Sequence, residues 1–347
     1  MSNPDRVRLS RKAGRSRVRW RATLLAGLLG LTIAACGSPA DVVPAQPGAK
    51  AAPAKFTLGL ISQSASQWPA YVMLDEDIDA RHGLAIEPVQ TGGSSNSIQQ
   101  TLAGEVDAGE APVERAIQVA TERRAKLRMI CASELYYSSS VVASPDITSI
   151  EQLRGKRISV VSKDDSTYYL LQELLERHGI SAKAWVPVFT AANSATRYAA
   201  LKAKSVDAVV VASPLDLKAE DEGNNVVVDL GEEFPDFAFT SFVATEEALR
   251  TNKPRLRQFV AAYAEAIDWL LDPANEQRAT AILASNTKLD PQTTKRLYSL
   301  LITEKRAFAK NAVIPAESIK VVQERLAHAG LISQVRSADK FSVDLVG

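Results

Sequence analysis

The segment Ser144–Thr167 has the sequence SPDITSIEQLRGKRISVVSKDDST, and it predicts the point at which the chain enters a second α/β lobe. Pro145 lacks a backbone N–H, so it marks the end of the strand before it. Ile158–Ser162 is rich in β-branched residues, which is typical of a short strand. The polar loop Lys163–Thr167 follows, and a helix begins after it. Ligands in α/β proteins bind where strands end beside helix N-termini, so this loop is a candidate binding site.

Three short motifs carry a resemblance to a known family. They are Leu153-Arg-Gly-Lys-Arg157, Thr91-Gly-Gly-Ser94 and Leu102-Ala-Gly-Glu-Val-Asp107. Through them, the chain from about Phe56 to its end resembles the solute-binding proteins of ABC importers of the nitrate, sulfonate and taurine type. The resemblance implies a periplasmic-binding-protein-like type II fold, with an ABC permease in the cytoplasmic membrane as the partner.

The chain contains two halves with the same order of features. The sequence of each half predicts the same elements in the same order. These are a strand, a polar loop, a helix that ends in Arg-His-Gly, a second strand, a loop, a helix and then Val-Asp-Ala. The Arg-His-Gly sequences begin at Arg81 and Arg177, and the Val-Asp-Ala sequences begin at Val106 and Val206. We therefore expect two similar lobes, each an α/β sheet with helices on its faces. Chance agreement between common strand–helix units is the alternative.

Two crossing strands are expected to join the lobes, near Ser139–Pro145 and near Phe237–Ala244. The first lobe then comprises residues 56–143 and 239–347, and the second comprises residues 144–238. Apolar residues recur at helical spacing between Leu256 and Leu271, and further amphipathic segments run to about Leu331. Because two crossings return the chain to its starting lobe, this helical C-terminal region is expected to pack on the first lobe.

The first 35 residues differ in charge from the rest of the chain. They hold eight Arg and Lys residues against Asp5, a net charge of +7, so the remainder carries −6 of the total of +1. The apolar run Ala22–Ala35 is shorter than the roughly 20 residues of a membrane-spanning helix and fits a secretory signal. Small residues before Cys36 resemble a bacterial lipobox, in which that cysteine is lipidated. We expect a lipoprotein signal peptide over residues 1–35 and a flexible tether over residues 36–55, which are rich in Ala, Pro and Gly. An ordinary signal peptide is the alternative.

The sequence lacks the common signatures of enzymes. It has no P-loop, no dinucleotide-binding glycine motif, no His-Glu-x-x-His and no Gly-x-Ser-x-Gly. His82, His178 and His328 lie just before a glycine at expected helix ends, where a histidine complements the helix dipole. Cys131 lies in an apolar segment, which favours a buried and inert thiol. We therefore expect no catalysis, no metal site and no cofactor. A mildly acidic mature protein also lacks the basic surface that binding to nucleic acid requires.

Polar loops at the expected carboxyl ends of the strands form the candidate ligand site. The candidate residues are Gln63, Ser64, Gln67, Trp68, Gly92, Gly93, Ser94, Ser95, Asn96 and Glu110 in the first lobe, and Asp164, Asp165, Ser166, Thr167, Asn193 and Ser213 in the second. Backbone N–H groups at Gly93–Asn96 suit the charged head of an anion at a helix N-terminus. The carboxylates Glu110, Asp164 and Asp165 would repel that anion unless they point outward as helix caps. Trp68 either stacks on the ligand or forms the wall of the cleft.

These features favour a receptor anchored by lipid in the periplasm or at the cell surface. Its function would be to bind a small organic anion of the sulfonate or nitrate type and deliver it to an ABC permease. A nitrogen heterocycle, such as a pyrimidine precursor, is the alternative ligand. An enzyme of pyrimidine synthesis on the same fold is the alternative of another class, and export with a lipid anchor argues against it. We expect a monomer whose lobes close on the ligand by hinge motion.

Overall fold

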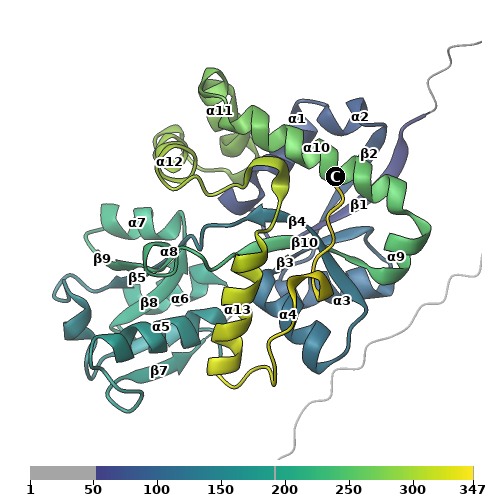
Figure 1. Ribbon diagram of the computed structural model, residues 1–347. Helices are drawn as coiled ribbons and strands as arrows, with labels where there is room; N and C mark the ends of the chain where they lie inside the picture. Colours follow the sequence, from purple (N-terminus) through teal and green to yellow (C-terminus); the bar gives the residue numbers. More distant parts are fainter. Residues whose placement is uncertain (1–51, 191–192, 347) are drawn as a thin grey trace, which may run out of the picture. The chain divides into compact units, whose positions relative to one another are not determined.

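Two mixed five-stranded sheets form the two lobes of the protein (Figure 1). The computed structural model describes residues 52–190 and 193–346, so the signal peptide and tether expected over residues 1–55 lie almost wholly outside the described residues. The first sheet has the order β2-β1-β3-β10-β4 and consists of β1 (Ala54–Leu60), β2 (Leu84–Gln90), β3 (Ala108–Pro112), β4 (Leu127–Glu134) and β10 (Thr240–Thr245). The second has the order β7-β6-β8-β5-β9 and consists of β5 (Ser139–Ala143), β6 (Arg157–Val160), β7 (Val186–Phe189), β8 (Ala208–Ala212) and β9 (Asn225–Asp229).

The sheets share one topology, which confirms the prediction of two similar lobes. In each sheet the first three strands of the order are parallel, and the fourth runs antiparallel to both of its neighbours. That fourth strand is β10 in the first lobe and β5 in the second. Since β5 pairs within the second sheet, the chain first passes between the lobes at residues 135–138, ahead of the expected boundary after residue 143. Pro145 does follow the end of a strand, but the sequence could not show which sheet that strand would join.

The repeated Val-Asp-Ala motif has the same structural role in both lobes. One carboxylate oxygen of Asp107 accepts the backbone N–H of Thr57 at 2.8 Å, next to the middle of β1. Asp207 accepts the backbone N–H of Arg157, at the start of β6, also at 2.8 Å. Each aspartate thereby ties the segment before one strand to the neighbouring parallel strand. This shared hydrogen bond gives a physical reason for the repeat.

Helices cover the faces of both sheets. Those of the first lobe are η1 (Ala65–Gln67), α1 (Trp68–Asp75), α2 (Ile78–Arg81), α3 (Ser94–Ala103) and α4 (Val113–Glu122). Those of the second are η2 (Ile150–Leu153), α5 (Ser166–Arg177), α6 (Ser194–Lys202), α7 (Leu215–Asp221) and α8 (Leu230–Glu233). The two Arg-His-Gly sequences end α2 and α5 as predicted, and the glycines adopt positive φ angles of 76° at Gly83 and 72° at Gly179. Among the described residues, no helix has the length and apolarity to cross a bilayer.

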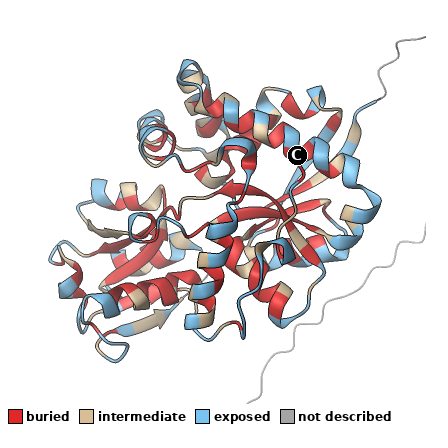
Figure 2. Cartoon of the chain, viewed as in Figure 1, coloured by how far each residue is buried: buried red, intermediate tan, exposed pale blue. Residues whose placement is uncertain are grey.

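The C-terminal region is helical, and its first part packs on the first lobe as predicted. It consists of α9 (Glu246–Thr251), α10 (Lys253–Leu271), η3 (Pro273–Asn275), α11 (Glu276–Thr287), α12 (Pro291–Leu297), the π-helix η4 (Tyr298–Glu304), η5 (Lys310–Ala312), α13 (Ala316–His328) and η6 (Ala338–Lys340). Helices α10 and α11 pack against α1, and Phe259 stacks on Phe56 of β1 with ring centroids 5.0 Å apart. Figure 2 shows buried residues along these helices and along both sheets.

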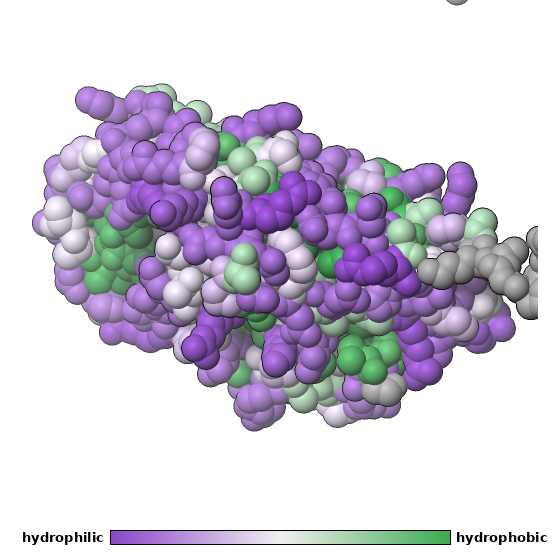
Figure 3. Space-filling model, turned by 90° about the horizontal axis from the view of Figure 1, so that it is seen from above, coloured by the Kyte–Doolittle hydropathy of each residue, from purple (hydrophilic) through white to green (hydrophobic). Residues whose placement is uncertain are grey.

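The segments between the lobes are apolar and well packed. Tyr137, in the first passage, makes edge-on contacts with Phe237 and Phe239 of the return passage, with ring centroids 5.5 and 4.8 Å apart. Tyr137 also donates a hydrogen bond from its hydroxyl to Ser166 Oγ at 2.9 Å. The two passages are therefore held to each other and to the start of α5. The face seen in Figure 3 is mainly hydrophilic, with separate hydrophobic patches.

Candidate functional site

A hydrogen-bonded network joins the loop after β1 to the carboxylate of Glu110 in β3. Gln67 donates from Nε2 to Glu110 Oε2 at 2.5 Å, and its Oε1 accepts from the backbone and the hydroxyl of Ser64 at 3.0 and 2.7 Å. The Ile61 N–H and the Ser133 hydroxyl also donate to Glu110, each at 3.2 Å. The structure thus brings together three predicted site residues, Ser64, Gln67 and Glu110. Glu110 is fully buried, and this burial raises the pKa of its carboxyl group.

A second glutamate, Glu134 at the end of β4, lies beside this network. Its side chain is fully buried, and no donor meets normal hydrogen-bond geometry at its carboxylate, although the nearby hydroxyls of Ser66 and Ser138 lower its pKa by hydrogen bonding. Burial raises the pKa of Glu134 to about 7, and the negative charge of Glu110 adds to the rise. The hydroxyl of Tyr71 in α1 is also buried without a partner, and Glu110 contributes to the rise of its pKa. Acceptor and hydroxyl groups therefore gather around Glu110.

The loop after β6 in the second lobe is mainly a helix cap. Asp165 is the N-cap of α5 and accepts from the backbone and the hydroxyl of Thr167 at 3.0 and 2.6 Å. Asp164 Oδ1 accepts from Ser162 Oγ at 2.6 Å, and Asp164 Oδ2 accepts from Arg115 of α4 at 3.1 Å. The hydrogen bond from Ser162, together with Arg115, holds the pKa of Asp164 below its usual range. The capping alternative therefore has structural support for Asp165, whereas Asp164 forms an ion pair with Arg115 instead of capping the helix.

A further carboxylate and a guanidinium group face this cap. Glu114 in α4 is buried, and burial together with the nearby charge of Asp165 raises its pKa to about 7. Arg197 in α6 is 3% exposed, donates to the carbonyl of Val210 at 2.7 Å, and interacts electrostatically with Asp165 and Tyr137. Arg197 therefore compensates part of the negative charge on the second-lobe side.

The glycine loop after β2 holds its shape through its own contacts. Asn96 donates from Nδ2 to the carbonyl of Thr91 at 3.2 Å, and Gly92 has a φ of 77°, which favours glycine. Gly93 is the N-cap of α3, and no side chain caps this helix. Ser95 and Asn96 are exposed. The first backbone N–H groups of α3 are thus not satisfied by a capping side chain.

The remaining predicted residues lie at the rim or in the interior. Asn193 is the N-cap of α6 and accepts from the Thr196 N–H at 2.8 Å, and Ser213 is buried and donates to Asp216 at 2.7 Å. Gln63 is exposed. Trp68 is fully buried, and its indole N–H donates to the carbonyl of Ala279 at 3.0 Å. This position favours the wall alternative for Trp68 over stacking on a ligand.

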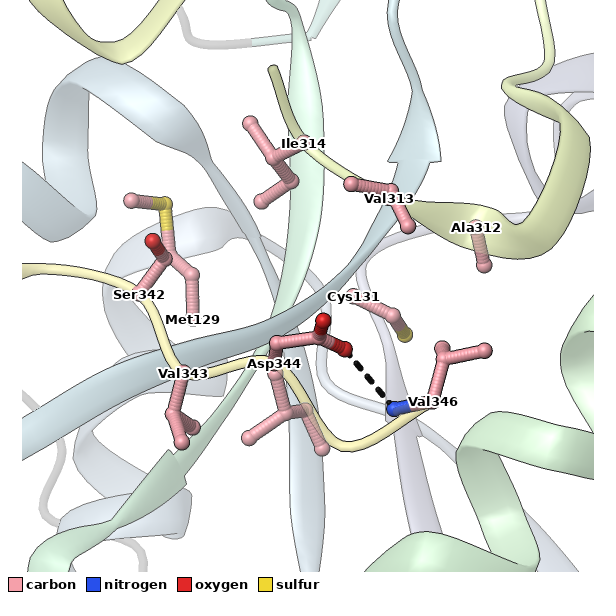
Figure 4. A pocket seen from close by; sticks show the side chains of 10 residues that line it. Met129, Cys131, Ala312, Val313, Ile314, Ser342, Val343, Asp344 and Val346 are labelled. Carbon is pink, nitrogen blue, oxygen red and sulfur yellow. Dashed lines mark hydrogen bonds between the residues drawn. The ribbon is translucent and has the colours of Figure 1, made fainter. Parts of the chain in front are cut away.

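A groove between α3 and α4 connects the first lobe to the second-lobe loop. It has a volume of about 500 Å³, within the range of ligand sites, and it includes the predicted residues Ser95 and Asp164 together with Arg115 and Gln118. Gln118 donates to the backbone carbonyl of Asp164 at 3.1 Å. A separate cavity of about 60 Å³ lies between β4 and the C-terminal segment, beside Cys131 (Figure 4). It is too small for an organic solute, and burial raises the pKa of Cys131 above its usual range, as expected for an inert thiol.

Among the described residues, the ion pairs between the lobes all have their basic and acidic partners on the same sides. The basic partner lies in the first lobe or the C-terminal helices, and the acidic partner lies in the second lobe. Arg296 binds Asp221 at 2.8 Å, Lys305 binds Asp229 at 3.5 Å, and Arg325 of α13 binds Glu173. The C-terminal helices therefore contact both lobes, which the sequence did not predict. Opposite charges on the two sides favour the contact between the lobes.

A family model for "NMT1/THI5 like" proteins matches residues 73–276 of the chain. The chain belongs to the NMT1/THI5-like family. None of the curated proteins matches the sequence. In the described residues of this NMT1/THI5-like chain, no group of three or more His, Cys, Asp or Glu side chains could hold a metal ion.

Several solved structures with the same fold are described as binding proteins. The chain is similar to the nitrate-binding protein NrtA of Synechocystis PCC 6803, with a TM-score of 0.72, 12% identity, and coverage of 84% of this chain and 86% of the other. It is similar to the alkanesulfonate-binding protein SsuA of Xanthomonas axonopodis pv. citri bound to MOPS, with a TM-score of 0.66, 17% identity, and coverage of 85% and 99%. The ligand-binding component of an ABC-type import system from Staphylococcus aureus gives a TM-score of 0.71, 13% identity, and coverage of 84% and 98%. These matches confirm the predicted periplasmic-binding-protein type II fold of this family member.

Sequence reasoning missed three residues of the site, Glu114, Glu134 and Tyr71. Each lies inside a regular element, α4, β4 or α1, whereas only loop residues were considered. The acidic character of Glu134 at the end of an apolar strand was a usable signal, because carboxylates are almost never fully buried without a partner.

Proposed function

We propose that the protein is an extracytoplasmic solute receptor of an ABC importer, and that it binds one small molecule between its lobes. The observation that carries the proposal is the arrangement of two similar sheets, with Arg115 and Gln118 of helix α4 in the first lobe bound to Asp164 in the loop after β6 of the second. The family match and the binding proteins of the same fold support it. A permease with its own ATPase would take over the solute, since this chain has no P-loop. We propose that the receptor acts as a monomer and is not an enzyme.

Two classes of solute remain candidates for this site. An organic anion of the sulfonate or nitrate type would place its head at Gly93–Asn96, where the first N–H groups of α3 lack a capping side chain. A nitrogen heterocycle would instead donate hydrogen bonds to carboxylates. The buried carboxyl groups of Glu110, Glu114 and Glu134 support the second class, because their ionised forms would accept hydrogen bonds from a donor and would repel an anion in a site of low dielectric constant. An enzyme of pyrimidine synthesis remains the alternative of another class, and turnover of the bound solute would identify it.

The glycine loop provides a direct test of the binding site. Replacing Ser94, Ser95 and Asn96 together by Leu is expected to abolish solute binding and leave the fold intact, because Ser95 and Asn96 are exposed and Ser94 only half-buried. The measurement is mass spectrometry of the small molecule that co-purifies with the native protein and with the variant. Circular dichroism checks that the variant is folded. An unchanged amount of bound solute would place the site elsewhere.

Lipid anchoring is a separate part of the proposal. We expect the mature protein to begin at Cys36, a residue outside the described structure, and to sediment with membranes. Cells that express the native chain should incorporate radioactive palmitate into it, and the variant Cys36→Ser should not. Cys131→Ser is the matched control, since Cys131 is buried and should not affect labelling. Label that persists in Cys36→Ser would contradict the lipid anchor and leave the receptor function untouched.

A further inference from the structure

A groove lined by basic side chains lies on the first lobe, between the α4–β4 connection and the C-terminal segment. Its volume is about 420 Å³. Five of the lining residues are basic and one is acidic, and these six are Arg124, Lys126, Arg128, Arg336, Lys340 and Glu246. The groove therefore has a net charge of +5 − 1 = +4, whereas the chain after residue 35 carries −6. Positive charge is thus concentrated at one place on an acidic protein, which favours an anionic partner there.

Most of this positive charge is not neutralised by the rest of the described structure. Glu246 binds Arg128 at 3.1 Å, so this acidic side chain is already paired. In the part of the chain that the structure describes, no acidic side chain forms an ion pair with Arg124, Lys126 or Arg336, and all three are exposed. These three cations remain available to an anion from outside the protein.

The wall of the groove also contains a hydroxyl group without a partner. Thr121 of α4 lines the groove and is 8% exposed, and its Oγ1 forms no hydrogen bond with the described residues. A threonine within a helix commonly donates to the carbonyl one turn before it, and Thr121 does not. A buried hydroxyl beside several cations suits an oxygen-rich anion such as a phosphate group.

Exposed apolar side chains flank the basic groove. Leu102, at the end of α3, is 42% exposed and lines a neighbouring hollow that shares Lys126 and Glu246 with the groove. Val335, directly before Arg336, is 44% exposed. Basic side chains next to exposed apolar ones are typical of protein surfaces that lie on anionic membranes.

The groove lies at the edge of the first sheet where β1 begins. β1 is parallel to β3, and β10 is antiparallel to both β3 and β4, so β4 runs in the same direction as β1. Leu127 at the start of β4 therefore lies at the same edge as Ala54 at the start of β1, three strand spacings of about 4.8 Å away. The candidate ligand loops follow the carboxyl ends of β1 and β2, at the opposite edge. A membrane bound at the groove would leave those loops accessible.

We propose that this basic groove binds the phosphate groups of anionic membrane lipids and holds the first lobe against the bilayer. The inference goes beyond the proposed receptor function and does not require a lipid on Cys36. The cations of the groove contact the headgroups, while Leu102 and Val335 reach the boundary of the acyl chains. Each basic side chain close to an anionic bilayer strengthens the binding about fivefold.

The test places an environment-sensitive fluorophore beside the groove of the full chain, at Leu102→Cys. Vesicles of phosphatidylglycerol should shift its emission to the blue, and vesicles of phosphatidylcholine should not. High salt should abolish the shift, because it screens exposed charges. The same label at Phe189→Cys, 46% exposed in the second lobe, should not respond to either vesicle. The native chain treated with the fluorophore gives the background from Cys36.

A pair of substitutions tests the groove itself. Lys126→Gln together with Arg336→Gln removes two exposed cations, so the concentration of phosphatidylglycerol vesicles at half-maximal shift should rise about 30-fold. Lys183→Gln together with Lys295→Gln removes the same charge from exposed positions elsewhere and should leave the shift as it is in the labelled chain without these changes.

Three results would overturn the inference. They are an equal shift on the two kinds of vesicle, a response that survives the Lys126 and Arg336 substitutions, and no shift on either vesicle. In the third case, calorimetric binding of glycerol 1-phosphate to the native chain would assign the groove to a soluble phosphate compound instead. None of these results affects the receptor function, which depends on the solute that co-purifies.

Discussion

Glu134→Gln is expected to stabilise the free protein at pH 8 and to leave its stability nearly unchanged at pH 5. Burial raises the pKa of Glu134 from 4.5 to about 7, so the folded state holds this proton over a pH range where the unfolded chain releases it. The favourable contribution of the protonated group is therefore complete below about pH 4.5 and is lost as the pH rises through 7. At pH 8 the native protein buries a carboxylate charge, at a cost of about 3 kcal/mol. Glutamine has the same shape and no charge, so the variant avoids that cost.

The measurement is thermal unfolding of native and variant protein at several pH values between 5 and 8. The difference in melting temperature should grow with pH and reach several degrees at pH 8. Glu110 influences Glu134 and also has a raised pKa. Because Glu110 is present in both proteins, its contribution to stability cancels in the comparison. Glu105→Gln should show no such pH-dependent difference. A constant difference at all pH values would mean that Glu134 is not held neutral by burial.

A gain in stability from removing Glu134 would also bear on function. Natural proteins retain destabilising groups at sites where those groups bind or react, and a buried carboxylate is one such group. Loss of solute binding by Glu134→Gln together with a gain in stability at pH 8 would identify Glu134 as a ligand contact. A purely structural residue would lower the stability when replaced.

The sequence predicted the features that depend on local pattern. The repeat of Arg-His-Gly and Val-Asp-Ala indicated two similar lobes, and hydrogen bonds such as that from Thr57 to Asp107 explain why the repeated aspartate recurs. Asp165 caps α5 because a short polar side chain before a helix can reach its first N–H groups. These outcomes follow from residues close in sequence or from motifs that recur at fixed spacing.

The sequence could not predict features that depend on distant partners. Strand β5 joins the second sheet through pairs such as Val141 with Val210, which no local pattern reveals. The surroundings of Glu134 include the hydroxyl of Ser66, which is far away in the sequence and comes close only in the folded chain. In the same way, the contacts of Arg296 and Arg325 with the second lobe arise from the path of the C-terminal helices.

Trp68→Ala is expected to destabilise the protein by about 4 kcal/mol, the usual cost of removing a large buried aromatic side chain. Trp68 is fully buried in the first lobe and contacts Tyr298 edge-on, with ring centroids 6.0 Å apart. Its indole N–H binds the carbonyl of Ala279 in α11, so the residue joins α1 to the C-terminal helices. Truncation would leave a cavity and a carbonyl without its donor, and both effects lower stability.

The matched variant Trp68→Phe separates the two roles that the sequence left open for this residue. Phenylalanine keeps most of the apolar volume and loses the hydrogen bond. The lost hydrogen bond should lower the free energy of unfolding by only about 1 kcal/mol, in addition to the effect of the smaller ring. Chemical unfolding gives the stability of both variants, and calorimetry gives the solute affinity of Trp68→Phe, which should equal that of the native protein. If Trp68→Ala instead unfolds like the native protein but no longer binds solute, then Trp68 stacks on the ligand. In that case the first lobe must open at α1 when the solute enters, because in the present structure the indole ring is enclosed by α11 and η4.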